Sequence, residues 1–301
     1  MRINKLCKVF LIFTLLIGLS GCGFIREDIH IVFTSDIHGH VNSGMGYEGL
    51  KSYVKSLKRE NSYVTLVDGG DFSEGEDIVN ESMGQEIIDI MNDVGYSVAT
   101  LGNHDFDYGL DVLKDNIDRA KFDIVDCNIK YVGNGEDPFV KIKPYVIKRY
   151  GPVKVAYIGI LTPETVLTEN DSYKNCLEDG KLAYDLYHNP YESDGGDAIF
   201  ARVQEVIDEA RTKADYVVVL SHLGTNHSSD MNTETLINFT RGIDIVLDSH
   251  GHTTEDTMWE NIDGDEVLFF AVGKHFERVG EVIIKTNNSL AYKYVESFNY
   301  E

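Results

Sequence analysis

Side chains that can bind metal ions occur in five short groups along the 301-residue chain. The groups are Asp36-Ile37-His38, Gly70-Asp71, Gly102-Asn103-His104-Asp105, Ser221-His222 and His250-Gly251-His252. Carboxylate, amide and imidazole ligands can hold two divalent cations about 3.5–4 Å apart when one carboxylate bridges them. Such a pair lowers the pKa of a bound water and neutralises charge on phosphate oxygens. Because no cysteine lies in these groups, a closed structural zinc site is disfavoured.

Each group follows a segment with the apolar, β-branched composition of a buried strand. Strands are expected at residues 29–35, 63–67, 97–101, 123–125, 153–161, 216–220, 244–247, 267–272 and 281–285. Helical patterns lie between them, for example at residues 84–94, 110–120 and 197–214. This alternation predicts an α/β fold with a mixed sheet, in which ligands converge at the carboxyl ends of strands. The polar, tyrosine-rich stretch 168–196 is interpreted as a long surface excursion.

In their order along the chain, the five groups resemble the motifs of the calcineurin-like metallophosphoesterase superfamily. Longer stretches are similar to the N-terminal domain of the 5′-nucleotidase/UDP-sugar hydrolase/2′,3′-cyclic phosphodiesterase family. These stretches are residues 91–96 leading into 101–109, then 144–147, 153–163, 214–224 and 242–252. The resemblance covers roughly residues 28–285 and implies a sandwich of two mixed β-sheets flanked by helices, an α/β/β/α arrangement.

The resemblance also implies a ligand set for two divalent ions, Mn²⁺, Zn²⁺ or similar. One metal would be held by Asp36, His38 and His252, the other by Asn103, His222 and His250, with Asp71 as the bridge.

A catalytic pair is implied beside these ligands. His104 would face the substrate phosphate, and Asp107 would orient its imidazole and favour its protonated form. Tyr108 is placed at the rim of the site, and Asp105 is interpreted as a helix-entry acid. The remaining histidines divide into His40 and His227, which either reach the substrate or are solvated, and His30, His188 and His275, which are expected to be structural or on the surface.

The sequence departs from the family in two places. Ser249-His250-Gly251-His252 stands where relatives usually have Gly-His-Ser-His, which moves the flexible residue to a position between the histidines. Larger relatives also carry a C-terminal domain that stacks the nucleobase. This chain ends at Glu301, so we expect the phosphoesterase core without that nucleotide-binding domain, and nucleotide selectivity is left open.

The expected function is therefore hydrolysis of a phosphate ester by hydroxide that two metals activate. A nucleotide is the expected substrate, with a 5′-nucleotidase or a 2′,3′-cyclic phosphodiesterase activity. Two alternatives stay open: a surface binding protein that kept the fold but little turnover, and an esterase for another oxyanion, such as a sulfur-linked one.

Composition limits the partners. The chain has 27 basic and 50 acidic residues, a formal net charge of -23. An acidic surface repels the backbone of nucleic acids, so a polymeric nucleic-acid partner is excluded and a small phosphorylated substrate is expected. Hydrophobic residues make up 43% of the chain, enough for a sizeable core.

The N-terminus resembles a lipoprotein leader. Arg2, Lys5 and Lys8 precede an apolar run at residues 9–19, which ends in the lipobox-like Leu19-Ser20-Gly21-Cys22. We expect a signal peptide at 1–21, a tether at 22–28 and the catalytic domain at 29–301. The lipid on Cys22 would anchor the exported protein to the outer face of a bacterial membrane; an ordinary signal peptide is the alternative. The other cysteines of the mature chain, Cys127 and Cys176, either pair or remain thiols.

Overall fold

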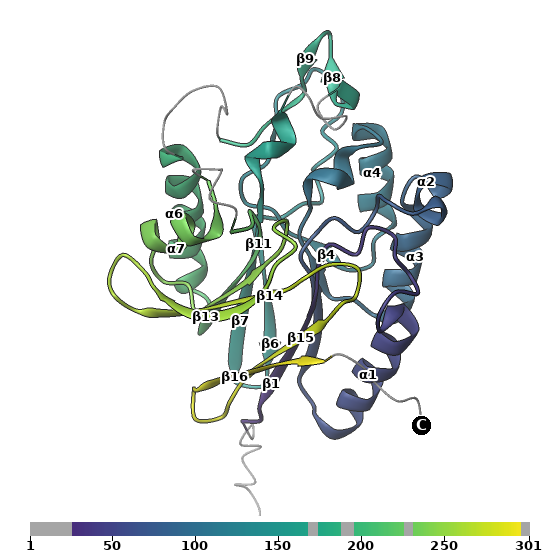
Figure 1. The fold of residues 1–301 in the computed structure, drawn as a ribbon. Helices are drawn as coiled ribbons and strands as arrows, with labels where there is room; N and C mark the ends of the chain where they lie inside the picture. The colour runs from purple at the N-terminus through teal and green to yellow at the C-terminus, as the bar shows by residue number, and fades with distance from the viewer. Residues whose placement is uncertain (1–25, 168–173, 188–195, 226–230, 296–301) are drawn as a thin grey trace, which may run out of the picture.

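The fold is a four-layer sandwich in which two six-stranded sheets pack face to face between two layers of helices (Figure 1). The computed structural model describes residues 26–167, 174–187, 196–225 and 231–295. The α/β/β/α architecture expected from the sequence is confirmed. The expected signal peptide, Cys22, His188 and His227 lie outside the described residues.

The first sheet contains the N-terminal strands and the two C-terminal ones, in the order β16-β15-β1-β2-β3-β4. Strands β1 to β4 run parallel to one another, whereas β15 is antiparallel to both β1 and β16. The strands of this sheet are β1 (Ile29–Thr34), β2 (Val64–Asp68), β3 (Val98–Ala99), β4 (Asp123–Ile124), β15 (Val279–Ile284) and β16 (Leu290–Val295).

The second sheet has the order β13-β14-β12-β11-β7-β6. Its four inner strands are parallel, and an antiparallel strand closes each edge. The strands of this sheet are β6 (Tyr145–Tyr150), β7 (Val153–Leu161), β11 (Tyr216–His222), β12 (Ile245–Asp248), β13 (Thr254–Glu260) and β14 (Glu266–Val272). Two further antiparallel pairs are small: β5 (Lys130–Tyr131) with β10 (Tyr184–Asp185), and β8 (Leu177–Glu178) with β9 (Lys181–Leu182).

Helices cover the outer face of each sheet, with α1 to α4 on one side of the molecule and α6 and α7 on the other (Figure 1). The α-helices are α1 (Gly46–Glu60), α2 (Asp77–Ser82), α3 (Gln85–Val94), α4 (Leu110–Arg119), α6 (Asp197–Arg211) and α7 (Thr233–Phe239). Two short 3₁₀ helices, η1 (Asn103–Phe106) and η2 (Pro163–Val166), follow strands β3 and β7.

The core consists of three apolar clusters, one for each interface between layers. Strand β1 shows why the sequence forms this arrangement. Ile31 and Phe33 belong to the cluster between the sheets, whereas Val32 belongs to the cluster beneath the helices. Because alternate side chains of a strand point to opposite faces, a strand buried on both faces must be apolar throughout.

The expected helices agree closely with α3, α4 and α6, but several elements differ from the sequence-based expectation. The strand expected at 97–101 shrinks to β3, and the antiparallel strands β6, β13 and β16 were not anticipated. The interpretation of 168–196 as a surface excursion is wrong for part of its described portion. Tyr184 and Leu186 are buried there, and the Tyr184 ring lies 5.0 Å from that of Phe106.

Three smaller features bear on the predictions for the termini and cysteines. Cys127 and Cys176 are both buried, free thiols. At the end of the expected tether, Asp28 accepts a hydrogen bond of 3.0 Å from Lys285. None of the helices in the described parts of the chain is both long and apolar enough to cross a membrane.

Candidate metal centre

The five residue groups meet where strands of both sheets end. Strand β1 ends at Thr34 and β2 at Asp68 in the first sheet, while β11 ends at His222 and β12 at Asp248 in the second. The loops that follow these strands and β3 carry the other acidic and histidine side chains of the groups. Three groups of potential ligands result. Two of them combine residues from both sheets, and the third, which consists of Glu74, His104 and Asp107, comes from loops of the first sheet.

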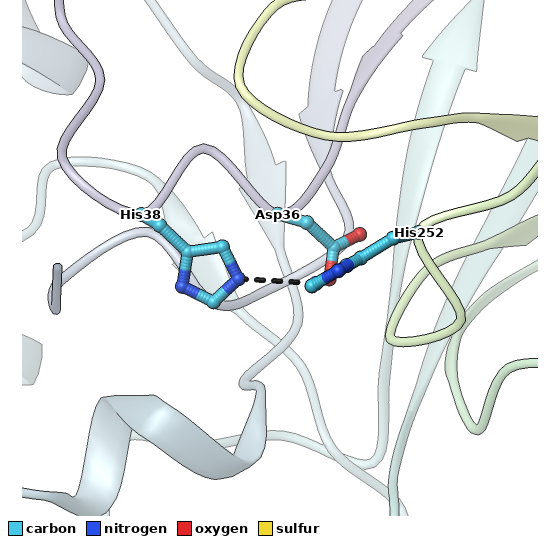
Figure 2. A group of neighbouring side chains, drawn as sticks. All are labelled: Asp36, His38 and His252. Carbon is cyan, nitrogen blue, oxygen red and sulfur yellow. Dashed lines mark hydrogen bonds and ion pairs between the residues drawn. The ribbon is translucent and has the colours of Figure 1, made fainter.

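The first cluster consists of Asp36, His38 and His252, whose ligand atoms all lie within 4.8 Å of one another (Figure 2). The Nε2 atoms of His38 and His252 are 3.3 Å apart, and His252 Nε2 is 3.6 Å from Asp36 Oδ1. Asp36 is fully buried, and its Oδ2 has no hydrogen-bond partner among the described residues. Two facing imidazole nitrogens beside a buried carboxylate oxygen fit a divalent cation.

The second cluster consists of Asp71, His222 and His250. Asp71 Oδ2 lies 3.1 Å from His222 Nε2 and 3.8 Å from His38 Nε2, so this oxygen is close to imidazoles of both clusters. Its other oxygen, Oδ1, accepts a hydrogen bond of 2.9 Å from the backbone N–H of His104. Asp71 thus has the position that a bridging carboxylate requires.

The ionisation of the two buried carboxyls differs. Burial, reinforced by repulsion from Asp71, raises the pKa of Asp36 well above its usual range. Burial also opposes ionisation of Asp71, but the imidazoles of His222, His38 and His104 outweigh it and lower the pKa of Asp71. Two cations between these groups would remove the electrostatic cost of ionising Asp36.

Helix η1 places the remaining motif beside Asp71. Asn103 begins η1 and is buried, and its role as a ligand stays a prediction. Asp105 accepts hydrogen bonds from the backbone N–H groups of Gly102, Asp71 and Ser73. The helix-entry acid of the sequence analysis therefore also fixes the loop that carries Asp71.

The histidine next to Asn103 is accessible. His104 Nδ1 lies 2.8 Å from Asp107 Oδ2, and the side chain of His104 is 43% exposed. The hydrogen bond to Asp107 raises the pKa of His104 to about 9, against the opposing effect of burial. A cationic imidazole that stays in contact with solvent is able to meet an anionic substrate.

The backbone of the centre adopts unusual conformations. Positive φ angles occur at Asp36, His38, Asp71, His250 and His252, five of the seven residues predicted as ligands. Residues other than glycine rarely adopt this region, and each such conformation costs on the order of 1–3 kcal/mol. The loops therefore hold these side chains at a cost in stability, as is typical of functional sites.

Three histidines of the clusters have a ring nitrogen that contacts an oxygen outside the predicted ligand set. His222 donates a hydrogen bond of 2.7 Å from Nδ1 to the carbonyl oxygen of Gly69. His38 Nδ1 lies 3.1 Å from Glu74 Oε2, and His250 Nε2 lies 3.0 Å from Glu164 Oε2. Glu164 follows strand β7 at the same edge of the sheet. The expectation that ligands lie at the carboxyl ends of strands, which located the other groups, could therefore also have located Glu164.

Two further histidines extend the centre. The rings of His40 and His275 are stacked at 3.7 Å, and the ring of His275 lies 5.7 Å from that of His38. The expectation that His275 is structural or on the surface is incomplete, because the residue lies beside the first cluster. His30 has a structural role as expected, because it pairs with the buried Glu281 at 2.6 Å.

Comparison with known proteins places the chain in a family. Residues 51–275 match the family described as bacterial capsule synthesis protein PGA_cap. A 2′,3′-cyclic-nucleotide 2′-phosphodiesterase/3′-nucleotidase of Haemophilus influenzae is 28% identical over 257 residues, which cover 75% of this chain and 36% of that protein. The chain spans about a third or less of the first curated relatives that it matches.

Solved structures share the fold. A 5′-nucleotidase precursor from Thermus thermophilus superposes with a TM-score of 0.71 at 22% identity, covering 89% of this chain and 54% of the other. The calcineurin-like phosphoesterase YfkN from Bacillus subtilis gives a TM-score of 0.68 at 23% identity and 91% coverage of both chains. Together, these matches show that the chain belongs to the PGA_cap family and has the fold of the calcineurin-like phosphoesterases, with its resemblance lying in the N-terminal domain of the 5′-nucleotidase family.

Proposed function

We propose that this chain is a phosphoesterase that holds two divalent ions and hydrolyses a nucleotide phosphate ester. The observation that carries the proposal is the position of Asp71, whose Oδ2 lies 3.1 Å from His222 Nε2 and 3.8 Å from His38 Nε2. A carboxylate between two imidazole clusters suits a pair of cations. When bound, these cations supply a water of lowered pKa and neutralise charge on the phosphate oxygens.

The ligand assignment of the proposal follows the two clusters. One ion would be held by Asp36, His38 and His252, the other by Asn103, His222 and His250, with Asp71 shared by both. The oxygen and nitrogen donors fit Mn²⁺ or Zn²⁺.

Two residues outside the ligand set, His104 and Asp107, would act as a pair on the substrate phosphate and the leaving group. His104 points an imidazole with a raised pKa toward solvent, where it can stabilise an anionic phosphate or give a proton to the leaving oxygen. Asp107 orients that imidazole by holding its Nδ1 at 2.8 Å. Because both members of the pair are in contact, a binding protein without turnover is the weaker alternative.

The nucleotide substrate rests on the relatives, which are named as cyclic-nucleotide phosphodiesterases and 5′-nucleotidases. The test uses the purified full chain, loaded with Mn²⁺, on bis-p-nitrophenyl phosphate, 2′,3′-cyclic AMP, 5′-AMP and p-nitrophenyl sulfate. Turnover of a phosphate ester that EDTA abolishes is the expected result. Full activity in a metal-stripped sample, or turnover of the sulfate ester alone, would contradict the proposal.

For the N-terminus, we propose lipidation of Cys22 and anchoring at the outer face of the membrane. The support is the sequence Leu19-Ser20-Gly21-Cys22 at the end of an apolar run. Mass spectrometry of the native protein should detect a diacylglyceryl group on Cys22, and Cys22→Ser should move the protein out of the membrane fraction. An unmodified Cys22 would refute the anchor.

A further inference from the structure

Two glutamates outside the five motif groups contact the centre, one at each cluster. Glu74 Oε2 lies 3.1 Å from His38 Nδ1, and Glu164 Oε2 lies 3.0 Å from His250 Nε2. Neither glutamate belongs to the predicted ligand set. Each one contacts a histidine of a different cluster, and Glu74 Oε2 also lies 3.8 Å from His104 Nδ1.

The contact of Glu74 decides which nitrogen of His38 is available. A carboxylate at Nδ1 accepts a hydrogen bond, which keeps the proton on that nitrogen and leaves a lone pair on Nε2. Nε2 is the atom that faces His252 at 3.3 Å and Asp71 Oδ2 at 3.8 Å. The side of the ring opposite Glu74 is therefore the side that faces the ligand atoms.

His250 has the reverse orientation. Glu164 contacts Nε2, so the proton is kept there and Nδ1 is left as the nitrogen with a lone pair. His250 shares its cluster with Asp71 and His222. The two glutamates thus select opposite tautomers, Nδ1–H at His38 and Nε2–H at His250.

Both glutamates are placed by their backbone. Ser73, next to Glu74, donates hydrogen bonds from N and Oγ to Asp105 at 3.0 and 2.6 Å, and the N–H of Glu76 bonds to the carbonyl oxygen of His38. Glu164 lies in η2, where Pro163 begins the helix and the hydroxyl of Thr162 accepts from the Glu164 N–H. Such fixed partners restrict the orientation of the rings that they contact.

We propose that Glu74 and Glu164 are positioning residues, each of which fixes the tautomer and ring orientation of one histidine at one cation site. This inference rests on the proposed function, because it assumes that each cluster holds a cation. It goes further by assigning each glutamate to a separate site: Glu74 to the site of Asp36, His38 and His252, and Glu164 to the site of Asn103, His222 and His250.

The test measures Mn²⁺ binding to the metal-stripped full chain by isothermal titration calorimetry, with two sites resolved in the wild type. Glu74→Ala should weaken one site by about 10–100-fold and leave the other within twofold, and Glu164→Ala should do the opposite. The Gln variants should retain most of the affinity, because an amide oxygen still accepts the imidazole N–H. Glu81→Gln, an exposed glutamate on α2, is the matched control.

Repeating the Mn²⁺ titrations in a variant that lacks one predicted ligand assigns the effect of each glutamate to a site. In His252→Ala, the remaining tight site should weaken further with Glu164→Ala but not with Glu74→Ala. Equal thermal melting temperatures of the metal-free variants would separate positioning from loss of fold. The positioning role would be overturned, and the proposed function left intact, if both Ala variants bound Mn²⁺ as the wild type does. The same conclusion would follow if each Ala variant weakened both sites equally. A wild-type chain that binds no cation would overturn the proposed function as well.

Discussion

The Nε2 atoms of His38 and His252 lie 3.3 Å apart, although the residues are separated by 214 positions in the sequence. His38 follows the first strand of one sheet, and His252 precedes the edge strand of the other. The contact therefore exists only because the two sheets pack face to face with the ends of β1 and β12 at a common edge. Each cation site of the proposal depends on that packing.

The shared carboxylate is expected to matter for both sites, whereas the carboxylate of the first cluster matters for one. Asp71→Asn should release both cations and reduce turnover by about 100-fold or more, because it removes the charge between the clusters. Asp36→Asn should lower the occupancy of one site. Metal content after gel filtration measures both effects, and two retained cations in Asp71→Asn would contradict the bridging role.

The catalytic pair should be separable from the metal ligands. His104→Ala is expected to reduce kcat by about 10²–10⁴-fold while the protein keeps its two cations, because His104 is not one of the predicted ligands and its Nδ1 pairs with Asp107. Asp107→Asn should show a smaller loss. Steady-state kinetics with metal analysis on the same samples provides the test; an unchanged kcat in His104→Ala would remove that residue from the mechanism.

Close packing around Asp71 makes Gly102 intolerant of a side chain. A Cβ at Gly102 would lie 2.1 Å from Asp71 Oδ1, a distance that forces the carboxylate to move. Gly102→Ala should reduce both metal affinity and turnover more than tenfold.

Gly95→Ala is the contrasting variant. Its Cβ meets nothing within 4 Å, but φ is 94°. We expect a loss of about 1 kcal/mol in stability from backbone strain, with turnover unchanged. For Gly102→Ala, a metal affinity equal to that of the wild type would contradict the prediction, because it would mean that the carboxylate can move without consequence.

Acid stability should depend on Glu281, which is fully buried on β15. It faces His30 of β1, Tyr53 of α1 and Lys293 of β16. Burial opposes its ionisation, but these three partners outweigh burial and lower the pKa of Glu281 to about 2 from its ordinary value of 4.5. A lowered folded pKa contributes stability above pH 4.5, and this contribution is lost as the pH falls toward 2.

The corresponding experiment compares urea unfolding of the wild type and Glu281→Gln between pH 7 and pH 2.5. The wild type should lose on the order of 3 kcal/mol from this group over that range, and the variant should lose correspondingly less. Parallel pH profiles for the two proteins would exclude Glu281 as a source of acid sensitivity.

The apolar runs of the sequence predicted an α/β fold with a mixed sheet, because parallel strands that are buried on both faces, such as β1, are apolar throughout. The sandwich of two sheets was implied by the resemblance to the family. Sequence patterns failed to predict elements that are short or that are buried on one face only. The edge strand β13 alternates exposed and half-buried residues, and β3 has only two residues, so neither carries a strong apolar signal. The buried Tyr184 escaped notice because most of residues 168–196 are polar, although Ala183 and Leu186 beside it are apolar and buried.

At the last motif, the structure changes the interpretation of the sequence. Positive φ angles fall at His250 and His252 themselves, and not at the glycine between them. The serine that replaces the usual glycine is buried, and its Oγ lies 2.6 Å from the carbonyl oxygens of Gly69 and Ser221. Ser249 thereby connects the loops of the two sheets, a role that local backbone preferences do not reveal.

The residue types at the ends of the strands could be predicted from local sequence, because strand ends and ligand chemistry are both local properties. The packing of the two sheets sets which of these residues meet, that Nε2 of His38 faces the other ligands, and that Glu74, Glu164 and His275 lie beside the clusters. These contacts join loops from separate strands, and their geometry is set by how the two sheets pack. No pattern within one segment contains that information.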